Sequence, residues 1–159
     1  MAKSKKEDSK FTVATNKKAF RDFFILERYD AGIVLQGCEV KSIREHNLNL
    51  KDSYARIKGG EVFLYNMHIS PYAKSRLEDI APTRVRKLLL HKREINKIEG
   101  KMKDKSLTLV PLSVYLHYSY VKVELALAKG KLKKDIRQDI EKRESDLEIR
   151  RAMKAKHRV

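Results

Sequence analysis

The 159-residue sequence contains no tryptophan, a single cysteine and no long hydrophobic run. The missing tryptophan excludes no class of protein, but a lone cysteine, Cys38, cannot form an internal disulfide or a cysteine cage for a metal. No segment approaches the roughly eighteen consecutive apolar residues of a membrane-spanning helix. The first ten residues carry charges with no apolar core after them, unlike a secretory signal. These absences favour a cytoplasmic location and no membrane partner.

The motifs of several enzyme classes are also absent. The sequence has no HExxH zinc motif, no GxxxxGK[ST] phosphate loop, no GxGxxG after a strand and no nucleophile elbow. Cys38 is more simply a buried thiol than a reactive one. The carboxylates Asp30, Glu39 and Asp52 form no recognisable catalytic constellation. We therefore predict a protein that is not an enzyme and that uses no metal or cofactor.

Positive charge is the first informative feature that is present. Lysine and arginine number 37 against 21 acidic residues, a net charge of +16. Such an excess opposes a compact state by self-repulsion unless a polyanion offsets it. Nucleic acid is the commonest partner of this kind, an acidic membrane surface is the second possibility, and a merely basic protein is the third.

The chain divides into three zones by composition. Residues 1–16 are polar and lysine-rich, which predicts a flexible arm. Residues 17–128 hold nearly all the large apolar side chains and are predicted to form the folded domain. Residues 129–159 form a charged tail.

Strand signals dominate the folded domain. The segments 23–29 and 32–37 are predicted as strands on either side of a turn at Asp30-Ala31-Gly32. Residues 54–65 indicate a hairpin that turns at Gly59-Gly60, where positive φ is needed. Residues 106–128 form two longer β-rich runs. In the second, Val121 to Leu127 alternate with polar or small residues, and Pro111 marks an edge or a bulge in the first.

Two segments, 38–46 and 91–104, have the spacing of short helices. Several short strands with few helices predict a mainly β fold, a small OB-like antiparallel barrel with accessory helices. A flat sheet backed by two helices is the alternative.

Five strings occur in an order that indicates a family. They are DAGIVLQGCEVKSIR (30–44), NLKDSYARI (49–57), GEVFLYNMHISPY (60–72), TRVRKLLLHKREI (83–95) and VKVELALAKGK (121–131). Together they resemble the successive signature blocks of the SsrA-binding protein family, also called small protein B. The resemblance covers residues 13–159.

This resemblance implies an RNA-binding function on an OB-like barrel. It implies binding to the tRNA-like domain of transfer-messenger RNA and, with elongation factor Tu, delivery of that RNA to stalled ribosomes for trans-translation. The tail, unstructured in isolation, is expected to become helical in the messenger channel and decoding centre of the ribosome. We expect the protein to act as a monomer.

The segment 86–94 supplies the side chains that such a protein needs. Basic groups meet phosphates, while apolar, amide or imidazole groups meet bases and sugars. In the family, the positions of Leu89 and His91 are associated with the RNA interface, and at least one of the three leucines 88–90 is expected in the core. The predicted RNA-binding residues are Asp30, Arg86, Lys87, Leu89, His91, Lys92 and Arg93.

Three positions depart from the family pattern. His91 stands where asparagine is frequent, Asp30 where glutamate is frequent, and Lys134 where histidine or an aromatic is common. The frequent DKR string is Asp135-Ile136-Arg137 here. The residues predicted to contact the ribosome are Lys131, Lys133, Lys134, Asp135, Arg137, Lys142, Arg143, Arg150, Arg151, Met153 and Lys154.

The apolar residues of the tail form no stripe wide enough to anchor a helix on the barrel. Asp139 and Arg143 have the spacing of a favourable helical ion pair. Two readings of the whole chain remain open beside the family function. One is a generic OB-type RNA-binding or ribosome-associated protein, and the other is a hydrolase that uses Asp30, Asp52 or His68.

Overall fold

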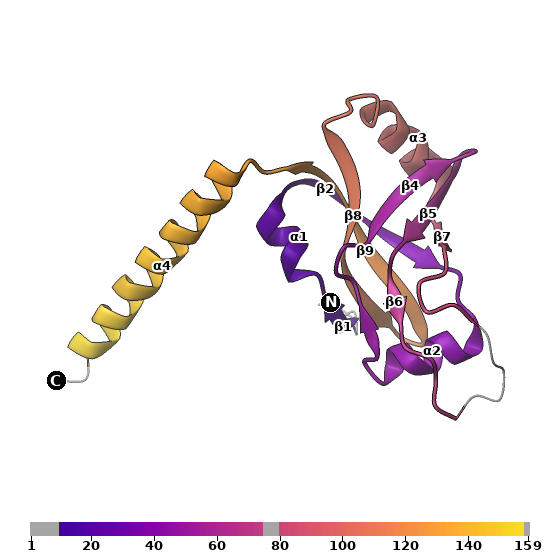
Figure 1. The fold of residues 1–159 in the computed structure, drawn as a ribbon, viewed down its shortest axis with the longest axis horizontal. Helices are drawn as coiled ribbons and strands as arrows, with labels where there is room; N and C mark the ends of the chain where they lie inside the picture. Colours follow the sequence, from indigo (N-terminus) through magenta and orange to yellow (C-terminus); the bar gives the residue numbers. More distant parts are fainter. Residues whose placement is uncertain (1–9, 75–79, 158–159) are drawn as a thin grey trace, which may run out of the picture.

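The computed structural model describes residues 10–74 and 80–157 (Figure 1). Strands and helices alternate irregularly along the chain. In order they are β1 (Lys10–Thr15), α1 (Lys17–Asp22), β2 (Phe23–Ile33), α2 (Gly37–Arg44), β3 (Leu48–Asn49), β4 (Tyr54–Lys58), β5 (Glu61–Tyr65), β6 (His68–Ile69), β7 (Arg86–Leu89), α3 (Lys92–Lys101), β8 (Leu107–His117), β9 (Tyr120–Gly130) and α4 (Lys133–Lys156).

The large antiparallel sheet closes on itself. Its strand order is β1-β8-β4-β5-β7-β2-β9, and β9 also pairs with β8. The second pairing completes a ring of strands, with β1 attached along β8. The predicted OB-like antiparallel barrel is therefore confirmed, and the flat sheet is wrong because its last strand would have lacked this second partner.

The barrel interior is filled by every second residue of its strands. Val121, Val123, Leu125 and Leu127 of β9 are all buried, as the alternation predicted. The α2 and α3 helices lie at opposite ends of the barrel in Figure 1 and contribute Ile43, Ile95 and Ile98 to the same core. The α3 helix falls within the predicted segment 91–104, and α2 begins one residue before the predicted segment 38–46 and ends inside it.

The predicted turn at residues 30–32 is wrong. β2 runs without interruption from Phe23 to Ile33 and pairs with β9 along its length. A register shift between Ile25 and Glu27 bends the strand instead. Pairing with a strand a hundred residues away overrides the local turn signal of an Asp-Ala-Gly sequence.

Two other local predictions are confirmed. The hairpin turns at Gly59 and Gly60, whose φ angles are +60° and +73°. This left-handed region is open to glycine at little cost, so the pair closes β4 and β5 tightly. Pro111 adjoins a register shift in the β8–β9 pairing, which is the predicted bulge.

The predicted zone boundaries differ from the observed ones at both ends of the domain. Residues 1–9 of the predicted arm lie outside the described residues, whereas residues 10–15 form β1 and pair with β8. At the other end β9 extends to Gly130. Both extensions come from strand pairing over long sequence separations, which composition does not reveal.

The α1 helix covers the outside of the barrel. A second apolar cluster joins Ala19 of α1 to Val110 and Leu112 of β8 and to Ala126 and Ala128 of β9. The polar and small residues that alternate with Val121 to Leu127 lie on the outer face of β9, and α1 covers the last two alanines among them.

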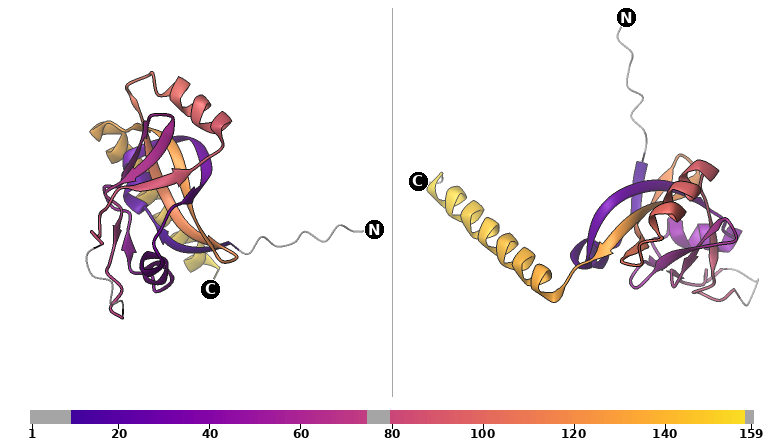
Figure 2. Two further views of the ribbon diagram at one scale, coloured as in Figure 1. Left: turned by 90° about the vertical axis from the view of Figure 1, so that its right-hand side faces the viewer. Right: turned by 90° about the horizontal axis from the view of Figure 1, so that it is seen from above.

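The α4 helix extends away from the barrel, as both Figure 1 and the right-hand view of Figure 2 show. None of its residues is buried, in agreement with the absence of a wide apolar stripe. Residues 133–156 are helical in this structure, and the proposed dependence of that helix on the ribosome stays a prediction. No helix in the described ranges is both long and apolar enough to cross a membrane.

Candidate nucleic-acid interface

The short strand β7 divides the basic-leucine segment between two faces. Arg86 and Leu88 point inward and are buried, while Lys87 is half-buried and Leu89 is exposed over 52% of its surface. This is the ordinary two-residue period of a strand. A large apolar side chain is thus held in solvent by a rigid element, which is the arrangement that an apolar contact with a base or sugar requires.

The pairing of β7 with β2 brings Asp30 and Leu89 to the same outer face. Gly32 is the partner of Leu89, and Asp30 lies two residues earlier on β2. A Cβ atom on Gly32 would come within 3.2 Å of the Leu89 Cβ, so glycine gives Leu89 its room. Because β7 and β2 are antiparallel, the chain after Leu89 runs in the direction that leads from Gly32 back to Asp30. His91, two residues after Leu89, therefore lies toward Asp30. The structure therefore assembles three of the predicted residues into one region.

The Asp30 carboxylate is fixed by its neighbours. The Tyr115 hydroxyl donates a hydrogen bond to it over 2.8 Å. Burial, and then this bond to a carboxylate, raise the pKa of Tyr115, so the phenol stays protonated and remains a donor. The Lys10 Nζ lies 3.9 Å from Asp30 and 5.0 Å from the centre of the Tyr115 ring. Asp30 is thus positioned to accept hydrogen bonds while its negative charge is partly offset.

Strand register extends this region beyond the predicted residues. Gly32 pairs with Lys122 of β9, Lys122 with Tyr115 of β8, and Tyr115 with Thr12 of β1. These positions form a band across the outer face of the sheet. Sequence analysis missed Tyr115 and Lys122, although the alternation within residues 107–130 places both on the face opposite the core.

Basic side chains border the same region. Lys92 and Arg93 are exposed in the first turn of α3, where a positive charge opposes the helix dipole. Their placement is unfavourable for the helix by itself and favourable for contact with an anion. Lys87 is ion-paired with Glu61 at 2.6 Å, so it would have to exchange a carboxylate for a phosphate.

Arg86 was predicted as a phosphate ligand, and the structure contradicts this. Its side chain is fully buried and donates to Glu39 at 2.5 Å and to the carbonyl oxygens of Met67, Arg84 and Pro82. These four hydrogen bonds leave at most one of the five N–H donors of the guanidinium, and the side chain is buried, so it is not available to RNA. The alternation that exposes Leu89 also turns Arg86 inward, so this signal was available in the sequence.

Glu39 holds this buried cluster together. Burial acts to raise the pKa of Glu39, but hydrogen bonds from Arg84, from the Gln36 backbone and from Arg86 outweigh it and keep the pKa below its usual value. The ionised carboxylate on α2 lies between Arg84, just before β7, and Arg86, the first residue of β7. Its role is structural, which removes Glu39 from the candidate acid–base groups.

The tail helix presents most of its predicted ribosome-binding residues to solvent. The exposed ones are Lys133, Lys134, Arg137, Lys142, Arg143, Arg150, Arg151, Met153 and Lys154. Asp135 is half-buried and its carboxylate accepts from the Leu132 N–H over 3.2 Å, so it caps the helix.

Lys131 differs from the other predicted tail residues because its side chain is held by contacts with Asp139 and Phe24. Its side chain is 8% exposed, its ammonium group lies 2.5 Å from Asp139, and it stacks 5.0 Å from the Phe24 ring centre. The sequence spacing suggested a pair between Asp139 and Arg143, but in the structure Asp139 is paired with Lys131. Lys131 joins α4 to the barrel and is not free to contact the ribosome in this arrangement.

The groups considered for catalysis do not come together. Asp52 is exposed and ion-paired with Lys18 at 2.5 Å, while Asp30 accepts a hydrogen bond from Tyr115. His68 is exposed on β6. Within residues 10–74 and 80–157, no three histidine, cysteine or acidic side chains are grouped as metal ligands.

Comparisons with known proteins point to one family. The family model described as SmpB protein matches residues 13–155. The SsrA-binding protein of Caldicellulosiruptor saccharolyticus is 54% identical over 97% of this chain and 98% of its own length. That of Halothermothrix orenii is 55% identical over 96% of this chain and 98% of its own.

A solved structure gives the same result for the fold. A chain from the structure described as "tmRNA-SmpB: a journey to the center of the bacterial ribosome" has 46% identity and a TM-score of 0.64, covering 76% of this chain and 85% of that one. The long matched segment and the shared fold agree. This chain belongs to the SmpB protein family.

Proposed function

We propose that the chain binds transfer-messenger RNA and brings it to stalled ribosomes for trans-translation. The observation that carries the proposal is the SmpB family match over residues 13–155. The relatives are named for binding SsrA, and the similar solved chain belongs to a complex of tmRNA and SmpB with the bacterial ribosome. The protein acts by binding RNA and not as an enzyme.

The region around Leu89 is the proposed contact with the tRNA-like domain. The exposed leucine packs against a base or sugar, and His91 and Asp30 exchange hydrogen bonds with base edges. Lys92 and Arg93 meet the phosphates on the same side. A tRNA-like fold exposes unstacked loop bases beside dense phosphates, which matches this mixture of groups.

The tail is the proposed contact with the ribosome. A 24-residue helix is roughly 36 Å long at about 1.5 Å per residue, enough to follow an RNA groove or channel. The exposed basic residues of α4 would then lie along ribosomal RNA. We further propose that the protein acts as a monomer in the cytoplasm, with elongation factor Tu joining through the RNA.

Variants at the proposed contact test this function. We expect Leu89→Ala and His91→Ala each to weaken binding to the tRNA-like domain by about 1–3 kcal/mol, as for loss of a base contact. Both side chains are exposed, so melting temperatures should stay near wild type. Filter binding and thermal melts of the same preparations provide the two readouts.

The matched control is Leu132→Ala, another exposed leucine outside the contact region. RNA recovered with the protein from its cells should be enriched in transfer-messenger RNA. Equal affinity for tRNA-like RNA and random single strands would instead indicate a generic OB-type RNA-binding protein.

A further inference from the structure

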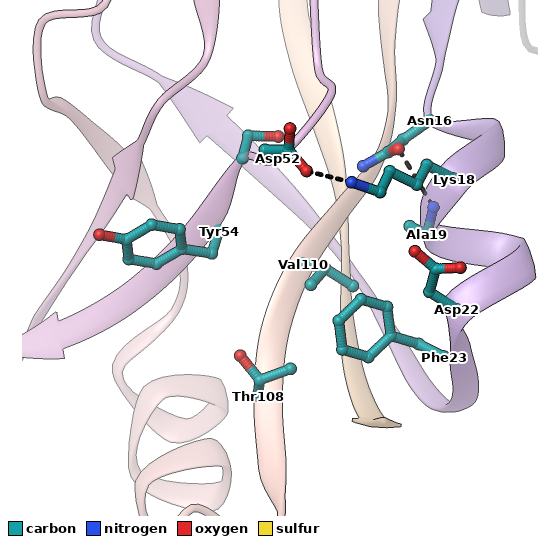
Figure 3. A pocket seen from close by; sticks show the side chains of 10 residues that line it. Asn16, Lys18, Ala19, Asp22, Phe23, Asp52, Tyr54, Thr108 and Val110 are labelled. Atoms are coloured by element: carbon teal, nitrogen blue, oxygen red, sulfur yellow. Dashed lines mark hydrogen bonds and ion pairs between the residues drawn. The ribbon is translucent and has the colours of Figure 1, made fainter. Parts of the chain in front are cut away.

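A hollow of about 300 Å³ lies between α1, the start of β4 and the first half of β8 (Figure 3). Phe23 and Tyr54 stand on two sides of it, and Val110 lies between them. The Phe23 ring and the apolar Val110 floor leave a slot for a flat ligand, while the Tyr54 ring at its edge is stacked on Tyr65 with 5.3 Å between ring centres. The volume is at the lower end of the range of about 300–1,000 Å³ that is usual for ligand pockets.

Polar groups are placed at the edge of this hollow. Thr108 lines it with a hydroxyl that has no hydrogen-bond partner among the described residues, and Asp22 contributes a half-buried carboxylate. The ion pair between Lys18 and Asp52 spans one side. An acceptor, a hydroxyl and an ammonium group beside an apolar slot suit the edge of a nucleobase.

The frame of the hollow is rigid because one buried asparagine ties its walls together. The Asn16 amide donates to the carbonyl oxygens of Leu50, at 3.3 Å, and of Pro111, at 3.0 Å. Its side-chain oxygen accepts from the Ala19 N–H at 3.2 Å, which starts α1. One side chain thus joins α1, the turn before β4 and the bulge of β8. The slot is formed before any ligand arrives.

A second hollow shares Lys18 with the first and has a different lining. It is enclosed by Lys17, Lys18, Arg21, Lys51 and the Arg143 of α4. Every one of these side chains is basic, and two of them are ion-paired, Lys18 with Asp52 and Arg21 with Asp22. In the described part of the chain, no carboxylate lies within 4.0 Å of Lys17, Lys51 or Arg143. Such a cluster is favourable when an anion sits among its members.

We propose that the two hollows together bind one unstacked nucleotide of RNA, its base in the apolar slot and its phosphate in the basic one. Lys17, Lys51 and Arg143, which are not ion-paired with Asp22 or Asp52, attract the phosphate to the second hollow, while the Asp22 and Asp52 carboxylates disfavour it in the first. A base stacked on an aromatic ring with its phosphate on lysines is a common way to hold single-stranded RNA. The inference rests on the proposed RNA-binding function.

This nucleotide site is separate from the Leu89 region. It opens beside β4 and β8 on one side of α1, while Asp30 and Leu89 lie on β2 and β7. The site also includes Arg143, so a bound phosphate would join the barrel to the tail helix. The nucleotide can come from transfer-messenger RNA or from ribosomal RNA, which share the same chemistry, and the experiment distinguishes them.

The test uses the full chain with two substitutions. Thr108→Phe fills the slot without a change in charge, and Lys51→Glu reverses one charge in the basic hollow. Dissociation constants are measured over a salt series for the isolated tRNA-like domain and for ribosomes, with adenosine 5′-monophosphate as the free-nucleotide probe. Thr83→Phe and Lys105→Glu, at exposed positions, are the matched controls.

We expect Thr108→Phe to weaken binding about tenfold, with an unchanged salt slope, either to the tRNA-like domain or to ribosomes. The partner whose binding is weakened is the source of the nucleotide. Lys51→Glu should reduce the slope for the same partner by about one, the loss of one phosphate contact. Lys51 is exposed, so this variant remains informative if Thr108→Phe does not fold.

The site is refuted if both variants match their controls toward both partners, or if adenosine 5′-monophosphate binds as tightly as RNA. Wild-type protein that ignores the tRNA-like domain would overturn the proposed function instead. The two failures are therefore distinguishable.

Discussion

Glu39 carries the clearest energetic consequence of a single residue. Its carboxylate is 4% exposed and lies between Arg84 and Arg86, so Glu39→Gln leaves a buried guanidinium without its counter-charge. Breaking a buried pair in this way costs about 3–5 kcal/mol. We expect a correspondingly lower free energy of unfolding, measured by urea denaturation at neutral pH.

The pH dependence of this effect follows from the lowered pKa of Glu39 in the folded protein. The stabilisation from the ionised carboxylate is present above the unfolded pKa and is lost as the pH falls through the folded pKa. The gap between wild type and Glu39→Gln should thus narrow in acid. Glu99→Gln, on the exposed side of α3, is the control and should change little. A gap that is constant with pH would contradict the role of the charge.

Arg86 shows what the sequence could and could not provide at this scale. The alternation of residues 86–89 was sufficient to predict that Leu89 is exposed and Arg86 is buried. An arginine next to a lysine nevertheless suggested a surface group. Its partner Glu39 lies 47 residues away, and no local pattern links the two. Asp30 and Leu89 were proposed from the family resemblance and their RNA contacts stay predictions, whereas the contact of Tyr115 with Asp30 required the strand register to be found.

Elements were predictable where the signal was local. The Gly59-Gly60 hairpin and the helices α2 and α3 are encoded within about ten residues each. β1 and the unbroken β2 were not, because both are defined by partners on β8 and β9 about a hundred residues later. Composition alone gives no reason to separate residues 10–15, a mixture of polar and apolar residues, from the arm before them.

The α4 helix is the element whose removal should separate two activities. None of its residues is buried, so the core of the barrel does not depend on it. We expect deletion of residues 132–159 to weaken tRNA-like RNA binding less than about tenfold, or 1.4 kcal/mol. Tagging of stalled nascent chains in a reconstituted translation assay should be lost.

The control for this deletion is a full-length chain with Arg150→Ala, which keeps the helix and removes one exposed cation. A truncated protein that still supports tagging would show that the tail only raises affinity. Loss of RNA binding together with the tail would show that the two activities are not separable.

At the scale of the whole molecule, the positive charge is unevenly divided. Residues 133–156 contain nine basic and six acidic residues, so the helix contributes +3 of the net +16. The barrel and the residues before it carry most of the excess. If the protein neutralises roughly five phosphates of the tRNA-like domain, their counterions are released on binding. The logarithm of the association constant should then fall with the logarithm of the salt concentration at a slope of about −4.

This slope should be nearly the same for the chain lacking residues 132–159, because the nearly balanced helix adds few net charges. The measurement is a salt series of dissociation constants on both proteins. A slope that drops by half on truncation would place the phosphate contacts on the tail.

The closure of the barrel also has a consequence for how the protein is made. Phe23 at the start of β2 pairs with Gly130 at the end of β9, and β1 pairs with β8 across a similar separation. Pairings this distant in sequence are slow to form. During synthesis the early strands must wait for the last ones, so a nascent chain that stops before β9 exposes unpaired strand edges and has no closed core. A chain whose synthesis stops before residue 120 therefore cannot close the barrel, because β9, the partner of β2, has not been made.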